Sequence, residues 1–578
     1  MKVQTTLPDP FKSEKVPPGN VRSSVDMSAC SEPDNDCARK LHFRAGDVPQ
    51  WKQAILLAFQ QTMICISGVL VLPYLVSEIA CAGVHTIALR VKLISATFVV
   101  TGITTVLQTV FGLRLAILQG PSFAFLPPLY AFANLPEMRC KATMNDYVPY
   151  EQYSSRIESI QGSLAVAAVL LIVLGSTGLI GTMARHVGPL TICPLLTLLC
   201  LGNVPVILEK ASLHWISLVQ FGLLMLFVMY LAETTVPIPY ISERRIKIAK
   251  YRLFGLFPYL LSILIAYGVC LVLTLADLIP ADSPARIDKE QSMNNLRESP
   301  WFQVPYPGQF GVPSINLGLL LGMLASCVAC TIESLGAYGI LAKVSNEKPP
   351  PSSSLNRAIV IEGIGSVIAG FLGVGVGITT YSENVAAVSI TRVASRFTMQ
   401  LAGGILICLG IFTKVGAVMA TIPDPMVGGM LAMGVCMIAG VGFGNLEFVD
   451  IKLSRNLTIM GTSVILGMVI PDYFTEHPVA TGNLHIDQML NILLTIRMFV
   501  GGLIAFFLDN TIGGATREQR GFRDEYTSKD DNEVEADGYA FPERINSFLI
   551  KNHGLCKFPF MPSMKRLQAT STTSLGSA

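Results

Sequence analysis

The stretch Val374–Val393, VGVGITTYSENVAAVSITRV, decides the fold, because it is apolar enough for a membrane yet cannot form one straight helix. It begins with Gly375 and Gly377, passes through the β-branched residues Ile378–Thr380, and takes on a helical pattern only near Asn384. Glycine and β-branched residues disfavour the interior of a helix. The sequence therefore predicts a short extended segment followed by a half-helix.

A second stretch, LQGPSFAFLPPL at Leu118–Leu129, has the same character in the first half of the chain. Gly120 and Pro121 interrupt its helical pattern, since proline lacks the backbone N–H that a helix interior needs. The two stretches are the third apolar segments of the two halves of the chain. Interrupted segments at matching positions are typical of inverted-repeat transporters with a binding site at the membrane midplane. The alternative is a pair of merely kinked helices.

Composition indicates a polytopic membrane protein. Only 14% of the 578 residues are charged and 51% are hydrophobic, whereas soluble domains carry about 25% charged residues. We expect an all-α fold of about fourteen transmembrane segments in two inverted repeats of about seven, with a short strand and a half-helix at the third segment of each. The predicted segments are Ala54–Ala82, Val91–Leu113, Leu115–Leu135, Gly162–Met183, Leu190–Leu208, Ile216–Leu231, Leu253–Leu275, Ile315–Leu341, Ala358–Leu372, Val374–Val393, Met399–Val418, Met426–Phe443, Leu457–Tyr473 and Leu490–Leu508.

Both ends of the chain are polar and are predicted to be disordered tails, at residues 1–50 and 511–578. Lysine and arginine gather at the ends of the even-numbered segments, as in ERRIKIAKYR at Glu243–Arg252. By the positive-inside rule this places both termini in the cytosol. The transmembrane domain then spans residues 51–510, and the plasma membrane is the expected location.

Two acidic residues stand inside apolar segments, where a charge facing lipid is very unfavourable. Glu333 lies in Ile315–Leu341, and Glu383 lies where the half-helix of Val374–Val393 begins. Such residues face the bundle interior or a wet cavity, so each is a functional-site hypothesis. The alternatives are a structural, hydrogen-bonded Glu333 and a Glu383 that only caps its half-helix. Asn384 would orient Glu383 or cap locally.

Several motifs resemble those of the nucleobase–ascorbate transporter family, and they occur in the same order and in the corresponding segments. Their sequences are most similar to those of the animal sodium–ascorbate branch. The likeness covers nearly everything from about Trp51 to Thr511. The motifs are FQQTMICISG (Phe59–Gly68), QGPSFAFL (Gln119–Leu126), GPLTICP (Gly188–Pro194), TIESLGAY (Thr331–Tyr338), ENVAAVSITR (Glu383–Arg392), IPDPMVGGM (Ile422–Met430), FVDIKLSRN (Phe448–Asn456) and MFVGGLIAFFLDNT (Met498–Thr511).

The resemblance implies a core domain (segments 1–4 and 8–11), a gate domain (segments 5–7 and 12–14), an elevator-like motion and a homodimer. It also implies substrate-binding roles for Glu333, Glu383 and the backbone around Phe123 and Ala124. The chemistry of a planar nucleobase agrees, since carboxylates accept from ring N–H groups and helix starts donate to carbonyls. The residues expected to bind substrate are Gln60, Ser122, Phe123, Ala124, Glu333, Tyr381, Glu383 and Asn384.

The chain departs from the family pattern at three positions. Gln61 follows Gln60 where the family commonly has histidine, Ala337 stands where aspartate is usual, and Ala386 replaces the signature glycine. We expect the coupling cation, Na⁺ or H⁺, near Glu333, Gln61 and Ala337. Because Gln61 and Ala337 depart from the family pattern, the resemblance does not decide between the two cations. No cofactor, metal site or enzymatic activity is expected.

The substrate is open between two candidates at this stage. Ascorbate is an anion near pH 7, and two carboxylates repel it unless cations neutralise them. Glu383 therefore favours an uncharged nucleobase, such as uracil or xanthine, whereas the overall likeness to animal ascorbate carriers favours L-ascorbate. An uncoupled facilitator and a non-transporting scaffold are further alternatives. A net charge of +2 gives no indication of nucleic-acid binding.

Other residues have structural interpretations. The 13 cysteines are scattered, and we expect free core thiols with no disulfide. Asp424 is expected to cap a helix, Glu78 to be hydrated at a segment end, and Glu362 to pair with Arg357 or cap a helix.

Overall fold

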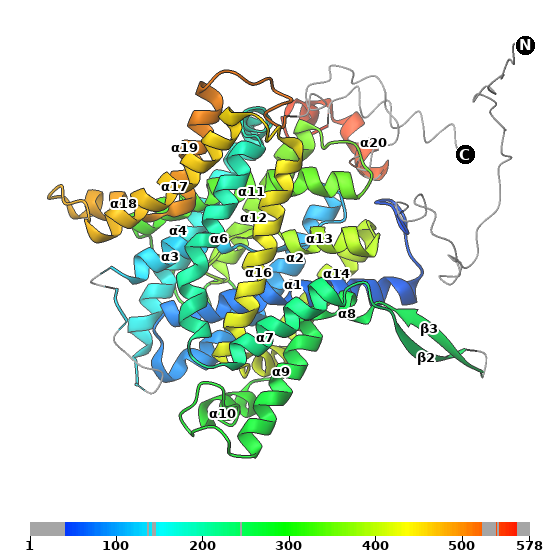
Figure 1. The fold of residues 1–578 in the computed structure, drawn as a ribbon, viewed down its shortest axis with the longest axis vertical. Coiled ribbons are helices and arrows are strands. Elements are labelled where there is room, and N and C mark those ends of the chain that lie inside the picture. Colours follow the sequence, from blue (N-terminus) through cyan, green and yellow to red (C-terminus); the bar gives the residue numbers. More distant parts are fainter. Residues whose placement is uncertain are drawn as a thin grey trace, which may run out of the picture. The chain divides into compact units, whose positions relative to one another are not determined.

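The structure is a computed structural model that describes residues 41–135, 138–140, 146–242, 245–522, 539, 541 and 543–562. It is mainly helical, with two short two-stranded sheets among these residues (Figure 1). Most of the predicted N-terminal tail, and residues 523–538 and 563–578 of the predicted C-terminal tail, lie outside the described residues.

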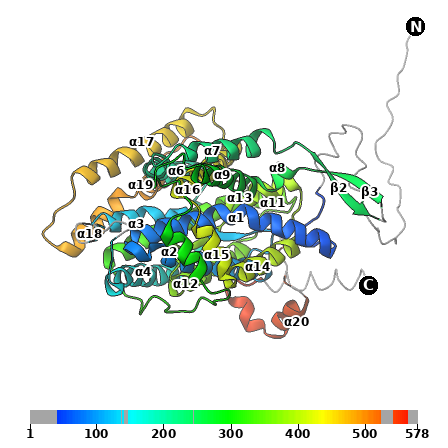
Figure 2. The same cartoon turned by 90° about the horizontal axis from the view of Figure 1, so that it is seen from below.

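The first half of the chain contains the first interrupted segment. Its elements are α1 (Trp51–Ile79), η2 (Gly83–His85), α2 (Thr86–Val110), β1 (Gln119–Pro121), η3 (Phe123–Phe125), α3 (Leu126–Ala133), α4 (Tyr150–Thr177), α5 (Leu179–Met183), α6 (Pro189–Ala211), α7 (Ile216–Met225), η4 (Leu226–Tyr230), β2 (Val236–Ser242), β3 (Arg245–Tyr251), α8 (Leu253–Leu256) and α9 (Pro258–Leu275). Strands β2 and β3 pair as an antiparallel hairpin that projects beside α8 (Figures 1 and 2).

The second half contains the second interrupted segment. Its elements are α10 (Glu290–Glu298), α11 (Leu317–Val344), α12 (Ser352–Phe371), β4 (Ile378–Thr380), α13 (Ser382–Thr391), α14 (Arg396–Ile411), α15 (Thr413–Ala420), α16 (Asp424–Gly444), η5 (Asn445–Phe448), α17 (Ser454–Glu476), α18 (Leu484–Thr495), α19 (Arg497–Thr511), α20 (Glu543–Lys551) and η7 (His553–Lys557).

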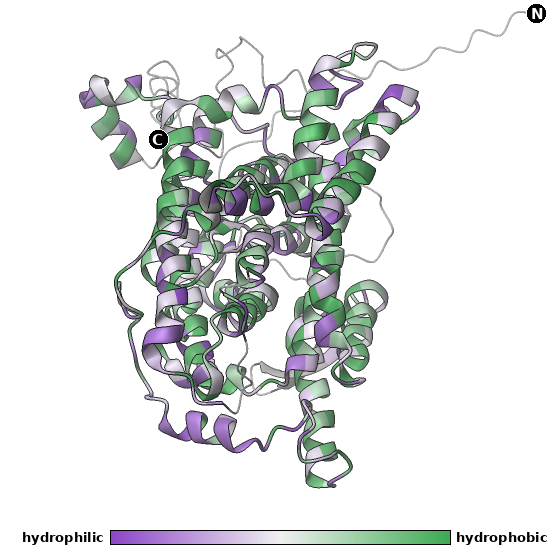
Figure 3. Ribbon diagram, turned by 90° about the vertical axis from the view of Figure 1, so that its left-hand side faces the viewer, coloured by the Kyte–Doolittle hydropathy of each residue, from purple (hydrophilic) through white to green (hydrophobic). Residues whose placement is uncertain are grey.

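Helix length and composition agree with a multi-pass membrane protein. Among the described residues, nine helices are long and apolar enough to cross a membrane, or up to eleven if each of two bent helix pairs is one span. Figure 3 shows that the long helices are largely hydrophobic along their length. The half-helices and α7 are shorter than a full span, so the count of fourteen segments stays a prediction.

The helices pack in two groups. In the first packing group, α12 lies along α4 and α2, α14 lies along α2 and α1, and α11 lies along α4. The half-helices α3 and α13 contact α11 in this group. In the second packing group, α16 lies along α6 and α7, while α17 and α19 lie along α6 and along each other. Helices α11 and α1 also contact members of the second group, so the groups meet along α1, α11, α6 and α16.

Ordered structure extends into both predicted tails. Phe43 forms a parallel bridge with Val393, and the Ser395 hydroxyl donates to the carbonyl of Asp47 at 2.6 Å. At the other end, the Arg357 guanidinium lies 4.2 Å from the ring centroid of Phe541. Chain segments that precede and follow the membrane domain in the sequence are therefore held against it.

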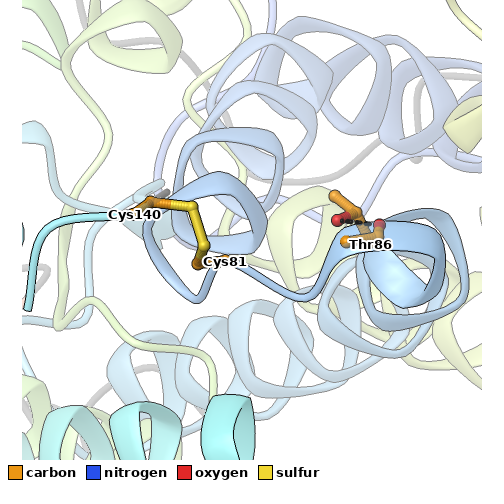
Figure 4. The surroundings of a disulfide bond; sticks show 4 residues. Cys81, Thr86 and Cys140 are labelled. Atoms are coloured by element: carbon orange, nitrogen blue, oxygen red, sulfur yellow. Dashed lines mark hydrogen bonds between the residues drawn. A yellow bond between two sulfur atoms is a disulfide. The ribbon is translucent and has the colours of Figure 1, made fainter. Parts of the chain in front are cut away.

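Cys81 and Cys140 form a disulfide, so the expectation of free thiols only is wrong for this pair. Cys81 follows α1, Cys140 lies in the connection between α3 and α4, and 59 positions separate them. Figure 4 shows the bond near Thr86, whose hydroxyl donates to the Gly83 carbonyl at 2.7 Å. The two cysteines meet because α3 is a half-helix that returns toward the end of α1, which spacing in the sequence does not reveal.

The interpretations of Asp424 and Glu78 are also wrong. Pro423 occupies the cap position of α16, whereas Asp424 is the first helical residue and its side chain contacts Arg90 at 3.1 Å. Glu78 contacts Lys210 at 2.6 Å and is only 23% exposed, rather than hydrated. Both acids meet basic residues from other helices, because the ends of α1, α2, α6 and α16 converge.

Candidate functional site

The two interrupted segments cross and pair with each other. Strand β1 pairs antiparallel with β4 in the register Gln119↔Thr380, Gly120↔Thr379 and Pro121↔Ile378, and all six residues are buried. The Tyr381 N–H donates to the Leu118 carbonyl at 3.0 Å, which extends the ladder. Each strand leads directly into a half-helix, η3–α3 or α13. The predicted strand and half-helix at each matching position are confirmed.

Glycine allows the strands to cross closely. A methyl group on Gly120 would lie 2.5 Å from Cδ2 of Tyr381, which no side chain can tolerate without movement. Gly375 has φ of +86°, a backbone conformation that glycine adopts without strain. The glycines that break the helical pattern in the sequence are therefore the residues that this crossing needs.

Glu333 reaches the start of the first half-helix from α11. Its side chain is buried, and its carboxyl group lies close enough to Ser122 to interact with it. One turn earlier on α11, the Cys330 thiol donates to the Ser122 Oγ at 3.1 Å. Within the described part of the chain, Glu333 Oε2 has no hydrogen-bond partner. A carboxylate oxygen is thus available where β1 turns into η3.

Glu383 and Asn384 lie in the first turn of the other half-helix, α13. Asn384 donates to the side-chain oxygen of Gln61 at 2.6 Å, which ties α13 to α1. Glu383 is 2% exposed, and its Oε1 finds no partner among the described residues. The Tyr381 side chain makes no cap hydrogen bond, and its hydroxyl accepts from the Gly68 N–H at 2.7 Å.

Unpaired polar atoms gather around α13, which contacts both α1 and α11. Over the described residues, these atoms belong to Gln60, Glu333, Glu383 and Asn384. Buried polar groups without partners are rare and unfavourable, because they have lost water without gaining a hydrogen bond. Such a cluster is chemically suited to a polar solute that offers both donors and acceptors.

The remaining predicted residues are also buried at this place. Phe123 and Ala124 begin η3, and the Ala124 N–H already donates to the Ser122 Oγ at 3.2 Å. The Gln61 side-chain oxygen accepts a hydrogen bond from Asn384, and Ala337 lies on α11 with 1% of its surface exposed. The Ala124 N–H therefore has an acceptor within the chain, and the binding role of the backbone around Phe123 and Ala124 stays a prediction.

A family model described as a permease family matches residues 52–476 of the chain. The chain belongs to this permease family. Solute carrier family 23 member 2 of Homo sapiens is 38% identical over 496 residues, covering 82% of this chain and 75% of that protein. Solute carrier family 23 member 1 of Rattus norvegicus is 37% identical over 539 residues, covering 90% and 88%.

Nucleobase-ascorbate transporter 5 of Arabidopsis thaliana is 30% identical to the permease over 520 residues, covering 86% of this chain and 94% of that protein. The resemblance to nucleobase–ascorbate transporters is thereby confirmed. The transmembrane domain of a cyanobacterium bicarbonate transporter, BicA, is 12% identical with a TM-score of 0.42, covering 81% of this chain and all of that one.

A further buried acid interacts with Glu333, and the sequence interpretation did not assign it to the site. Glu362, in the middle of α12, accepts hydrogen bonds from the hydroxyls of Ser334 (2.7 Å), Tyr338 (2.7 Å) and Thr380 (2.8 Å). It neither pairs with Arg357 nor caps a helix, so that interpretation is wrong. Ser334 and Tyr338 are four residues apart on α11, and their spacing within the motif TIESLGAY was the available signal.

Proposed function

We propose that this permease is a symporter that carries a small planar, uncharged solute, with a nucleobase such as uracil or xanthine as the favoured substrate. The observation that supports the proposal is the pair of buried carboxylates with unpaired oxygens, Glu333 and Glu383, at the two ends of the crossed strands. Ring N–H groups of a nucleobase would donate hydrogen bonds to these carboxylates, and the Gln60 amide N–H would donate to a ring carbonyl.

Coupling to a cation follows from the charges at the site. Glu333 lies within electrostatic range of Glu362 and Glu383. Carboxylates this close repel one another when all are ionised, so a bound Na⁺ or H⁺ favours the assembled site. We place the cation at Glu333. Neither Gln61 nor Ala337 offers a second charge, and the Gln61 side-chain oxygen already accepts a hydrogen bond from Asn384. The simplest stoichiometry is therefore one cation per solute molecule.

The proposed transport cycle is elevator-like. The first packing group, which carries the crossed strands and the polar cluster, would act as the core domain and move against the second packing group, the gate domain. The domain boundaries are those expected from the sequence, with the transmembrane domain at residues 51–510. We further propose a homodimer in the plasma membrane with both termini in the cytosol.

L-Ascorbate is the second candidate, because relatives of this chain carry the name nucleobase-ascorbate transporter. The test is uptake of labelled uracil, xanthine and ascorbate by cells that express the chain, with and without Na⁺ and at two pH values. Uptake of a nucleobase that depends on the cation gradient would support the favoured substrate. Uptake of ascorbate alone would overturn it, and gradient-independent flux would favour an uncoupled facilitator.

A further inference from the structure

Four charged side chains meet at the predicted outer end of the bundle. Glu78 comes from the last turn of α1, Arg90 from α2, Lys210 from the last turn of α6 and Asp424 from the start of α16. The Lys210 Nζ lies 2.6 Å from Glu78, and the Arg90 guanidinium lies 3.1 Å from Asp424 and 3.6 Å from Glu78. Two acids and two bases thus form one continuous network.

The network is largely removed from water. The side chains of Arg90 and Lys210 are 4% and 9% exposed, and those of Glu78 and Asp424 are 23% and 20% exposed. Arg90 also lies 3.7 Å above the ring centroid of Tyr74. Its Nε donates to the Ser77 hydroxyl at 3.2 Å. Ion pairs with this little hydration interact far more strongly than exposed ones.

Two of the three close ion pairs join the two packing groups. Glu78 and Arg90 belong to the first group, whereas Lys210 and Asp424 belong to the second. The Glu78–Lys210 and Arg90–Asp424 pairs therefore lie across the boundary between the groups. The Glu78–Arg90 pair lies within the first group. Any displacement of one group against the other at this end has to separate both of the crossing pairs.

We propose that these four residues form an outer latch, a set of ion pairs that holds the outer end of the permease closed and opens in every transport cycle. The inference rests on the proposed movement of the first packing group against the second. Each crossing pair stabilises only the arrangement in which the groups meet, so it shifts the conformational equilibrium toward the outward-closed state. Weakening the latch should populate the outward-open state.

The test needs no substrate, because it follows access to Cys330, which contacts Ser122 beside the polar cluster. A membrane-impermeant maleimide is added to intact cells, and modification of Cys330 is measured by peptide mass spectrometry. The Asp424→Asn and Lys210→Met substitutions each remove one of the two crossing pairs and leave the other in place. We expect modification of Cys330 to be about tenfold faster in each variant, because loss of one partly buried ion pair raises the population of the outward-open state by about that factor.

Three controls make the result specific. Asp424→Glu keeps the charge and should behave like the unsubstituted chain. Asp472→Asn removes an ion pair of 2.7 Å to Arg497, but both residues are in the second packing group, so Cys330 should be unaffected. Cys270, which is fully buried in α9, should stay unmodified in all variants, because its modification would indicate unfolding.

Unchanged access to Cys330 in Asp424→Asn and Lys210→Met would overturn the latch, as would equal acceleration by Asp472→Asn. Asp282→Cys, an exposed position in the connection between α9 and α11, reports which side this end faces. Its failure to react in intact cells would also overturn an outer latch. An absence of uptake by the unsubstituted chain would instead refute the proposed function, and the Cys330 measurement would still report on the latch.

Discussion

Glu333 and Glu383 differ from Glu362 in how their oxygens are used. Three hydroxyl groups donate to Glu362, which makes it a satisfied acid that joins α11, α12 and β4. Glu333 and Glu383 each keep an oxygen without a partner among the described residues. Because unpaired buried acceptors are unfavourable, they favour a ligand with donors. The first acid is suited to holding the site together, and the other two are suited to binding.

Glu333→Gln and Glu383→Gln should each reduce uptake about 10-fold to 100-fold, because an amide replaces one charged acceptor and a hydrogen bond to a charged group contributes about 1.5–3 kcal/mol. Uptake of labelled nucleobase is measured at equal surface abundance. Glu298→Gln, an exposed acid of α10, is the matched control and should transport normally. Normal uptake by both site variants would refute the assigned roles.

Glu362→Ala should lower the thermal stability of the purified permease. The substitution leaves the hydroxyls of Ser334, Tyr338 and Thr380 without their acceptor, and each buried donor left unpaired is unfavourable by about 1–3 kcal/mol. Melting of the detergent-solubilised protein is followed by tryptophan fluorescence. A melting temperature equal to that of the unsubstituted protein would mean that Glu362 does not hold these elements together.

The sequence allowed the residues of the polar cluster to be predicted better than the structural ones. Glu333 and Glu383 were recognisable because an acid in an apolar run is conspicuous. Glu362 was not, because Arg357, five residues before it in the sequence, offered a simple ion pair. The partners of Glu78 and Asp424 could not be predicted either, since Lys210 and Arg90 are remote in sequence and only the folded bundle brings them together.

At the scale of elements, the crossing of β1 and β4 depends on small residues. Gly120→Ala should disrupt it, because the added methyl group would lie 2.5 Å from the Tyr381 ring. We expect uptake to fall by at least about tenfold, as when overpacking disturbs a site by about 1–3 kcal/mol. Gly404→Ala in α14 is the control, since nothing lies within 4 Å of its added carbon. Equal uptake by the two variants would contradict this account of the crossing.

The elements themselves follow from the sequence, but their pairing does not. Glycine and proline in apolar runs predicted both interrupted segments, and the structure confirms a strand and a half-helix in each. The residue-by-residue register of β1 with β4 depends on packing against α1, α11 and α12, which no local pattern specifies. Ordered tail segments such as α20 were missed because their polar composition resembles that of disordered chain.

At the scale of the whole molecule, the Cys81–Cys140 disulfide restrains the chain between α1 and α4. The paired Cys81→Ser and Cys140→Ser substitutions should lower the melting temperature, because the bond closes a loop of 59 positions. In the chain-entropy model such a loop corresponds to at most about 4 kcal/mol. Melting is compared in the presence and absence of reductant. Reductant should lower the melting temperature of the unsubstituted protein but not that of the double variant, and the opposite result would contradict a stabilising role.

The β1–β4 ladder has a consequence for how selectivity can change. A pair of strands cannot slide by a fraction of a residue, and a shift by one residue turns every side chain to the opposite face. The three residue pairs of this ladder, beginning with Gln119 and Thr380, therefore keep the spacing between the two half-helices fixed. Variants selected for a larger or smaller solute should carry their substitutions on α1, α11 and α13, while the two strands remain untouched.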